Sequence, residues 1–432
     1  MKKTLLSVII SIGFTGSLHA QDLSTIYQQA LDKDPVVNRA KALRDVSLEG
    51  VTLARAPLLP QVSGSIGYTM SDASDVETDT LNYRVGLSMS LYDHAQWIGM
   101  DRAEKVAQQA EASYSATLQD LIVRVVDAYL NILRANDNVE FVQAEKRAIE
   151  RQLEQTKQRF EVGLIAITDV HEAQANFDTT IAQEIVARNT LELRKEQLRE
   201  ITGLYYDQVN TLNTQTFAAQ APAPETVEAW LELAQMNNLD LQAQRFAVDI
   251  AKADIDGSKA GHLPTLGLSG SLSRSDYEQD GVDGDSDSSS VGITLSVPIY
   301  SGGATTSRTA QSRSRFVAES ETLEQTYRGT VRNVRNSFND ISANISTIKA
   351  FEQAVISAES ALRATEEGFD VGIRTIVDVL NSTRNLFNAR KNLANARYDF
   401  ITAVISLKRA AGTLTVADID ALNKGLQAAT TS

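Results

Sequence analysis

The chain has 432 residues, a net charge of −14 and no cysteine, and 43% of its residues are hydrophobic. This hydrophobic content excludes wholesale disorder, and the lack of cysteine excludes disulfides, thiolate metal sites and a lipid anchor on an N-terminal cysteine. The negative charge opposes binding to nucleic acid, so no nucleic-acid partner is expected.

The first twenty residues have the plan of a secretory signal peptide. Lys2 and Lys3 precede an apolar run at 5–14, and small residues follow that end at Ala20. We therefore predict a signal peptide over residues 1–20 and an exported mature chain. No later stretch has eighteen consecutive apolar residues, so an exported chain of this kind is either soluble or a β-barrel.

The mature chain begins with helical periodicity and then changes to strand alternation. Helices are predicted near residues 22–33 and 36–54, and prolines end the second of them. Apolar residues then alternate with small polar residues over 61–70 and 81–92, which predicts two strands. The polar, acidic segment between the strands, 71–80, is expected to form a loop.

Two helices follow, and the first is unusually long. Because it contains no proline, one helix can run over residues 94–162, which is about 100 Å at 1.5 Å per residue. A helix of roughly half that length is predicted over 168–202. Apolar residues three and four apart, from Val123 to Leu133, form a narrow seam, so the long helix must pack beside others of its kind.

The second half repeats the first at a spacing of about 209 residues, as the positions of Phe160 and Phe369 show. We therefore divide the mature chain into a first repeat, 21–220, and a second repeat, 221–432. The second repeat is predicted to contain a helix near 240–258, strands over 265–275 and 290–300 with an acidic loop 276–290 between them, helices over 303–371 and 375–411, and a C-terminal tail. This tail and the segment 203–235 are expected to form a band around the middle of the molecule.

The four predicted strands have one apolar face and one face of Ser, Gly and Thr. Such strands are typical of a membrane β-barrel, and the alternative is a β-sandwich half-buried in a soluble domain. Four strands cannot close a barrel, and an open edge is not tolerated in lipid. If the strands span a membrane, several chains must share one barrel, and strand number alone allows two, three or four chains.

Each long helix ends at a Val-Gly pair, a few residues before the returning helix begins. Gly163 and Gly372 suit a helix C-cap, and Thr168 and Thr375 suit an N-cap, so each pair lies at the tip of a helical hairpin. Asp378 stands three residues after Thr375, which is the spacing of a capping box.

Taken together, these motifs resemble the TolC family of outer-membrane efflux and secretion channels over nearly the whole mature chain. The resemblance rests on Ala-Pro-Leu-Leu-Pro-Gln at 56–61, Gly-His-Leu-Pro-Thr at 261–265, Val-Gly-Leu-Ile-Ala-Ile-Thr-Asp-Val at 162–170, Val-Gly-Ile-Arg-Thr-Ile-Val-Asp-Val-Leu at 371–380 and Asn-Ala-Arg-Lys-Asn-Leu-Ala-Asn-Ala-Arg-Tyr at 388–398.

The resemblance implies a mainly α-helical chain with a transmembrane β-barrel, located in the outer membrane of a Gram-negative bacterium and extending into the periplasm. In a homotrimer, twelve strands would form an open barrel, continued by a twelve-helix α-barrel with a mixed equatorial band. The implied function is the exit duct for multidrug efflux or type I protein secretion. The implied partners are a periplasmic adaptor (membrane fusion) protein, an inner-membrane RND, ABC or MFS transporter, and outer-membrane lipid.

The resemblance also implies a constriction and a docking surface at the hairpin tips. Asp378 matches an aspartate whose carboxylates form a ring on the threefold axis. Asn381 stands where the family has a second aspartate, so the second ring is expected to be neutral. The residues that match the adaptor-docking grooves are Val162, Gly163, Leu164, Val371, Gly372 and Ile373.

A gate is implied at the same tips. Arg374 matches an arginine that helps hold the closed state against the neighbouring hairpin, at Thr168 and Asp169. Phe369 stands where the family has an assisting tyrosine, so a hydroxyl-mediated gate bond is expected to be lost. Opening would move the hairpins outward around Gly163 and its counterpart in the second repeat.

No pattern in the sequence supports an enzyme. Asp283, Asp285 and Asp287 alternate as in a calcium loop, but Thr294 stands where a bidentate glutamate is needed, so we predict a solvated tip. The histidines lack metal-ligand spacing, and nucleophile elbows, phosphate loops and Gly-rich dinucleotide turns are missing. We predict no enzymatic activity and no cofactor. The competing hypothesis is a secreted structural coiled coil or adhesin that uses its strands to oligomerise.

Overall fold

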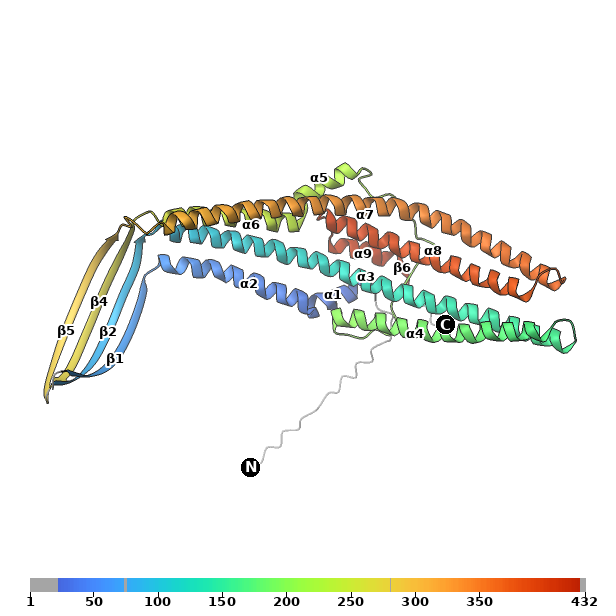
Figure 1. The fold of residues 1–432 in the computed structure, drawn as a ribbon, viewed down its shortest axis with the longest axis horizontal. Helices are drawn as coiled ribbons and strands as arrows, with labels where there is room; N and C mark the ends of the chain where they lie inside the picture. The colour runs from blue at the N-terminus through green and yellow to red at the C-terminus, as the bar shows by residue number, and fades with distance from the viewer. Residues whose placement is uncertain (1–21, 74–75, 280, 428–432) are drawn as a thin grey trace, which may run out of the picture.

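The computed structural model describes residues 22–73, 76–279 and 281–427 (Figure 1), and the predicted signal peptide lies outside them. The first half contains α1 Leu23–Lys33, α2 Pro35–Arg55, the short 3₁₀ helix η1 Ala56–Leu58, β1 Gln61–Ala73, β2 Val76–Tyr92, α3 His94–Glu161, α4 Ile167–Thr202 and β3 Thr211–Leu212. The second half contains α5 Val227–Asn237, α6 Leu239–Ala260, β4 Thr265–Gln279, β5 Val282–Ser296, α7 Ala304–Asp370, α8 Ile376–Ala410, α9 Val416–Lys424 and β6 Leu426–Gln427.

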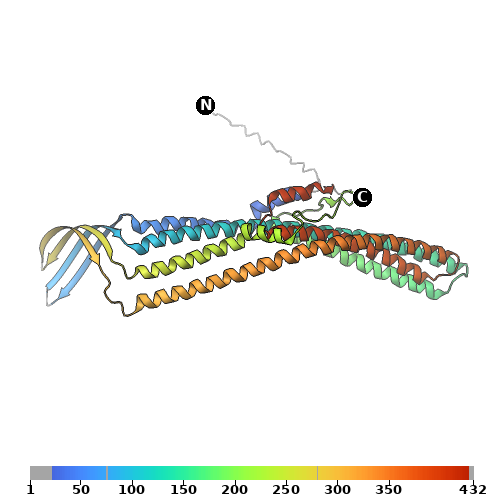
Figure 2. The ribbon, with the colours of Figure 1, turned by 90° about the horizontal axis from the view of Figure 1, so that it is seen from above.

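The molecule is long and narrow, with the sheet at one end and two helical hairpin tips at the other (Figures 1 and 2). Helices α3 and α7 run from the sheet to the tips, and α3, with 68 residues, is about 100 Å long. α2 and α4 pack one after the other along α3, and α6 and α8 do the same along α7. None of the described helices carries the apolar stretch that a bilayer crossing requires.

The hydrophobic core lies in the middle of the molecule, where α1 and α9 pack against α3. On α7, Val334, Ile341 and Ile348 are buried at seven-residue spacing, and Val126 and Leu130 of α3 belong to the same core. A seven-residue repeat keeps an apolar seam turned toward the neighbouring helix. The structure therefore confirms the predicted seams, and the helices hold one another side by side.

The segment after α4 and the C-terminal tail meet at the middle of the molecule. β3 pairs with β6 in antiparallel fashion, with Thr211 opposite Gln427. The hydroxyl of Tyr129 on α3 donates a hydrogen bond of 2.7 Å to the carbonyl oxygen of Asn210 just before β3. These contacts tie both segments to the centre of the long helix.

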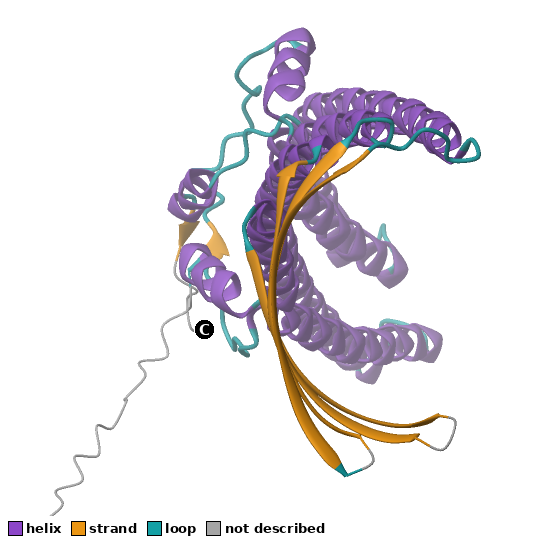
Figure 3. Ribbon diagram, turned by 90° about the vertical axis from the view of Figure 1, so that its left-hand side faces the viewer, coloured by secondary structure: helices purple, strands orange, loops and turns teal. Residues whose placement is uncertain are grey.

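The four long strands form one curved antiparallel sheet in the order β1-β2-β4-β5 (Figure 3). The register places the apolar residues of all four strands on one face, because residues opposite each other in a ladder point to the same side. One row across this apolar face consists of Val62, Leu87, Gly270 and Val291. The opposite face carries serines and glycines; the hydroxyls of Ser271 and Ser290 lie 3.0 Å apart there. Within the described chain, β1 and β5 each pair with one strand only.

The predicted loops 71–80 and 276–290 are wrong, because most of their residues continue the strands. Asp276 lies opposite Asp285 in the ladder of β4 and β5, where aspartates are unfavourable by propensity. Arg274 offsets their repulsion, since its guanidinium lies 2.9 Å from Asp276 and 3.4 Å from Asp285. Backbone pairing together with this cation extends the hairpin beyond its apolar part.

The predicted starts of β1 and β4 and the predicted end of β2 are confirmed, but the other strand boundaries differ. The strands predicted over 61–70, 81–92 and 265–275 are longer in the structure, for the reason given above. The strand predicted over 290–300 instead ends at Ser296. Pro298 follows two residues later, and proline has no N–H group to donate to a ladder.

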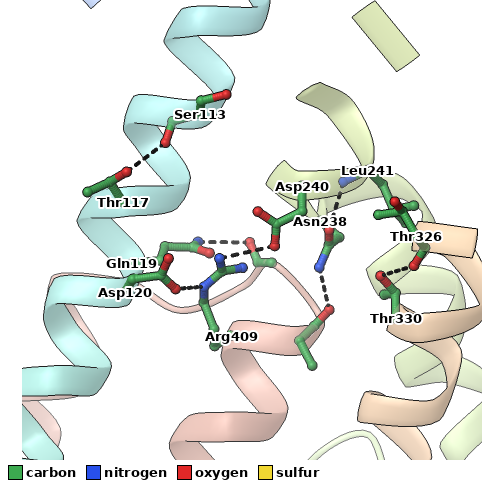
Figure 4. Close-up of polar contacts among 12 residues, drawn as sticks. Ser113, Thr117, Gln119, Asp120, Asn238, Asp240, Leu241, Thr326, Thr330 and Arg409 are labelled. Carbon is green, nitrogen blue, oxygen red and sulfur yellow. Dashed lines mark hydrogen bonds and ion pairs between the residues drawn. The ribbon is translucent and has the colours of Figure 1, made fainter. Parts of the chain in front are cut away.

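The end of α8 packs against the start of α6 and the middle of α3 (Figure 4). Arg409 of α8 forms ion pairs with Asp120 at 2.6 Å and with Asp240 at 3.1 Å. The side chain of Asn238 caps α6 and also donates a hydrogen bond of 2.9 Å to the carbonyl oxygen of Ala410. A single amide thus satisfies the ends of two helices, which stacks α6 on α8.

A half-buried carboxyl group on α3 makes stability depend on pH. Burial raises the pKa of Asp137 to about 6, above its ordinary value of 3.8, although its side chain accepts a hydrogen bond of 2.7 Å from the Tyr398 hydroxyl. The folded protein therefore holds this proton more tightly than the unfolded chain, so the stabilisation is present at low pH and is lost as pH rises to about 6.

Asp137→Asn keeps an acceptor for the hydroxyl of Tyr398. We expect it to raise the melting temperature at pH 7.5 and to leave it nearly unchanged at pH 4.5, measured by circular dichroism. The same change at exposed Asp178 serves as the control, and an equal shift at both pH values would contradict this interpretation.

Candidate functional site at the hairpin tips

The turn between α3 and α4 confirms the predicted C-cap at Gly163. This glycine has a φ of 77°, in the left-handed region that favours glycine. Its N–H donates to the carbonyl oxygen of Phe160 at 2.9 Å, and the N–H of Leu164 donates to that of Arg159 at 2.9 Å. These two hydrogen bonds form a Schellman motif, which ends the helix and satisfies its last carbonyls.

The turn between α7 and α8 has the same backbone. Gly372 also has a φ of 77°, and its N–H donates to the carbonyl oxygen of Phe369 at 3.1 Å. The N–H of Ile373 donates to the carbonyl oxygen of Gly368 at 2.8 Å. The two tips are therefore equivalent in backbone conformation and differ only in their side chains.

Both tips expose large apolar side chains to solvent. A cluster of such residues at the end of a molecule indicates an interaction surface, since isolated chains gain nothing from exposing it. The exposed fractions are 71% for Val162, 72% for Leu164, 70% for Val371 and 79% for Ile373. These are the apolar members of the predicted docking grooves, and both hairpins contribute to them.

The start of α8 confirms the capping box between Thr375 and Asp378. The backbone N–H and the hydroxyl of Thr375 donate to Oδ2 of Asp378 at 2.9 Å and 3.0 Å, and the N–H of Asp378 donates back to the Thr375 hydroxyl at 3.3 Å. The backbone hydrogen bond from Thr375, followed by that from its hydroxyl, lowers the pKa of Asp378. Asp378 is therefore a carboxylate at neutral pH. Asn381 lies exposed, one turn further along α8.

The predicted N-cap at Thr168 is wrong. α4 begins at Ile167 with Ala166 as its N-cap residue, and no side chain caps this end. The repeat explains the difference, because Ala166 stands opposite Thr375 at the 209-residue spacing. Thr168 lies instead within the first turn, beside Asp169, whose carboxylate is favourable near the positive end of the helix.

The two residues assigned to the gate in the second hairpin differ in their exposure to solvent. Phe369 is only 7% exposed and packs in a small apolar cluster with Ile149, whereas Arg374 is exposed. The side chain of Arg374 lies over its own hairpin, since a Cβ added to Gly368 would come within 2.8 Å of its Cγ. Among the residues that the structure describes, no hydrogen bond or ion pair joins Arg374 to the first hairpin.

A contact between the two hairpins was missed by the sequence analysis. Nη2 of Arg159 lies 2.7 Å from Oδ1 of Asp370, and its guanidinium lies 4.3 Å from the centre of the Phe369 ring. Arg159 is at the end of α3 and both partners are at the end of α7. The repeat could have indicated that Arg159 has a role of its own, because a glycine, Gly368, occupies the equivalent position at the 209-residue spacing.

The tips offer charges, helix ends and apolar side chains, which suit contact and gating. Over residues 22–73, 76–279 and 281–427, no group of three or more His, Cys, Asp or Glu side chains is arranged to hold a metal ion. The candidate site is therefore best described as a surface and a set of links between hairpins.

The sequence pattern of the family described as outer membrane efflux protein matches residues 26–204 and 230–413. The chain is 48% identical to the outer membrane protein TolC of Vibrio cholerae, over 99% of this chain and 100% of that protein. It is 41% identical to TolC of Escherichia coli, over 98% of this chain and 89% of that protein. It is 30% identical to the alkaline protease secretion protein AprF of Pseudomonas aeruginosa, over 91% of this chain and 85% of that protein.

Solved structures of other proteins share the fold. The outer membrane protein VceC of Vibrio cholerae has a TM-score of 0.78 at 19% identity, with 90% of this chain and 96% of that chain covered. The CmeC outer membrane channel of Campylobacter jejuni has a TM-score of 0.79 at 15% identity, with 99% of this chain and 98% of that chain covered. No comparison favours an adhesin or a secreted coiled coil.

These findings confirm the resemblance inferred from the sequence motifs. They identify an outer-membrane channel for efflux and type I secretion, located in the outer membrane of a Gram-negative bacterium. The matches extend over both halves of the chain, from the sheet to the hairpin tips. The chain belongs to the outer membrane efflux protein family.

Proposed function

We propose that three copies of this chain form one channel, with a twelve-stranded barrel continued by a twelve-helix tunnel. The observation that carries the proposal is the four-stranded sheet, whose edge strands β1 and β5 each have a single partner strand among the described residues and whose apolar face is exposed. An open edge is too costly in lipid, so the edges must pair with those of other copies. β1 and β5 run in opposite directions, which lets neighbouring copies continue the antiparallel order. The number three comes from the family resemblance.

The channel is a passive, water-filled exit duct driven by partners elsewhere. The face of the sheet opposite the apolar one carries serine and glycine, including Ser271 and Ser290, and would line the lumen. Membrane fractionation followed by gel electrophoresis tests this function. We expect the protein in the outer-membrane fraction as an oligomer that resists detergent until heated. A monomer released by washing or shear would contradict the proposal and favour an adhesin.

The exposed apolar tips are the docking surface for a periplasmic adaptor, which couples the duct to an inner-membrane RND, ABC or MFS transporter. Val162-Gly163-Leu164 and Val371-Gly372-Ile373 would form the grooves, because each tip presents two exposed apolar side chains beside a helix end. Crosslinking in the native envelope, followed by co-purification, would identify the adaptor and transporter.

The constriction of the closed channel would be a ring of three Asp378 carboxylates. Both contacts that the capping box makes to this carboxylate use Oδ2, which leaves Oδ1 available to face the axis. The hydrogen bonds from Thr375 lower the pKa of each Asp378, which opposes the rise that the neighbouring carboxylates of the ring would cause. The second ring, formed by Asn381 one turn on, would be neutral, so the mouth would carry fewer negative charges than in relatives with two aspartates.

Arg374 would hold the closed state by contacting Thr168 and Asp169 of a neighbouring hairpin. Its exposed position at the tip supports this role, as does the carboxylate of Asp169 near the start of α4. Arg374→Ser is expected to raise the conductance of the purified channel in planar lipid bilayers, because it removes the cation of this link. Arg363→Ser, an exposed arginine further up α7, is the control. Equal conductance of the two variants would exclude a gate role for Arg374.

A further inference from the structure

The two hairpin tips share a backbone but differ at the last turn of their long helices. α3 has Arg159 as the basic residue of its last turn, whereas α7 has none. At the corresponding place α7 has Gly368, whose missing side chain leaves room for the aliphatic part of Arg374. The negative end of the α7 dipole therefore receives no cation from its own helix.

Arg159 supplies that cation from the other hairpin. Its Nη2 lies 2.7 Å from Oδ1 of Asp370, its Nη1 donates a hydrogen bond of 3.4 Å to the carbonyl oxygen of Phe369, and its guanidinium lies 4.3 Å from the Phe369 ring centre. The contacts are an ion pair, a bond to one of the last carbonyls of a helix, and a cation–π interaction. One side chain thus makes three different contacts with a single turn of α7.

An apolar cluster lies beneath these contacts and joins the same two hairpins. Ile149 comes from α3, Phe369 from α7, and Ile376, Val379 and Leu380 from α8, and all five are buried. Phe369 belongs to both layers, because its ring packs in the cluster and also lies against the guanidinium. A movement that separates the hairpins at the tip must therefore break the polar contacts and expose this ring.

We propose that Arg159, Phe369 and Asp370 form an intrachain clasp that holds the two hairpins of one chain together in the closed state. This inference rests on the proposed function as a gated channel and assigns part of the gate to residues within one chain. Phe369 stands where the family has an assisting tyrosine, and here its ring and its carbonyl oxygen contact Arg159. Opening the channel requires this clasp to release.

The clasp is suited to reversible release. The side chains of Arg159 and Asp370 are 30% and 70% exposed, and exposed ion pairs are individually weak. A partner that docks on the neighbouring apolar tips can therefore compete with it at low cost. Val371, which directly follows Asp370, is one of these exposed tip residues, so docking and the clasp share the same turn.

Single-channel recording in planar bilayers tests the clasp. Arg159→Ala is expected to raise the closed-state conductance several-fold, and Asp370→Ala to raise it less, because the carbonyl and ring contacts of Arg159 remain. Arg151→Ala is the control: Arg151 is exposed on the same helix, and its side chain has no hydrogen bond or ion pair among the described residues. The double exchange Arg159→Asp with Asp370→Arg restores opposite charges and should return the conductance toward that of the unmodified channel.

The outcomes separate the clasp from the function on which it rests. If the unmodified protein forms no pores, both proposals fail. If it forms low-conductance pores and Arg159→Ala conducts like Arg151→Ala, the clasp alone is wrong. A rise for Arg159→Ala that the charge exchange does not reduce at all would also overturn the ion pair as a part of the clasp. Thermal melting followed by circular dichroism checks that each variant is folded. If the alanine variant does not fold, the charge exchange still tests the clasp.

Discussion

Gly412→Ala is expected to destabilise the protein by at least about 3 kcal/mol per chain, whereas Gly203→Ala should cost about 1–2 kcal/mol. Both glycines follow a returning helix and have a φ of 71°, so alanine is strained at either position. Their surroundings differ. A Cβ on Gly412 would overlap the carbonyl group of Asn237 and lie 2.7 Å from the backbone nitrogen of Asn238, but at Gly203 it would meet nothing within 4 Å.

The pair of variants isolates the close approach of α8 to the junction of α5 and α6. Because the backbone strain is the same in both, the difference between them measures the clash at Gly412 alone. Thermal unfolding in detergent, followed by circular dichroism at the helical band, is the measurement. Equal melting temperatures for the two variants would show that the backbone at the junction of α5 and α6 shifts without loss of stability, which would contradict the tight packing around Asn238.

Ile293→Arg is expected to prevent stable assembly in the membrane, whereas Thr294→Arg should be tolerated. Ile293 is 67% exposed on the apolar face of β5, and Thr294 is its neighbour on the opposite face. An arginine on the lipid face of a barrel costs about 2–4 kcal/mol near the bilayer midplane, and a trimer would incur this cost three times. On the side that faces the lumen of the proposed barrel, the same side chain would remain in water.

The amount of heat-labile oligomer in the outer-membrane fraction measures this effect. Both variants add one positive charge at adjacent positions of one strand, so charge and position along the strand are matched. If the apolar face did not contact lipid, an arginine on that face would carry no cost from lipid. Equal oligomer yields for the two variants would therefore contradict the lipid-facing assignment of this face.

The sequence alone was sufficient for features that depend on near neighbours in the chain. The seam through Val334 and Ile341 is readable because a helix brings residues seven apart to one side. The turns at Gly163 and Gly372 are readable because a left-handed residue after a helix favours glycine. The capping box of Thr375 follows from spacing in the same way.

The acidic hairpin ends show where local patterns are insufficient. The aspartates at 283, 285 and 287 have low strand propensity, and propensity alone predicts a loop. In the structure Arg274, on the neighbouring strand β4, forms ion pairs with Asp285 and Asp287, and the backbone ladder continues past them. The register that brings this cation opposite the acidic residues is a property of the sheet.

The amino-acid sequence by itself determined the repeat, the helical hairpins, the alternating strands and, through its motifs, the family. Only the tertiary structure decided how far the strands continue into the acidic segments, and that Arg159 contacts Asp370. The physical reason is the range of the interactions. Periodicity and capping are set within a few residues of the chain, whereas the contacts of Arg159 join residues about 210 apart, whose meeting depends on how the two hairpins pack.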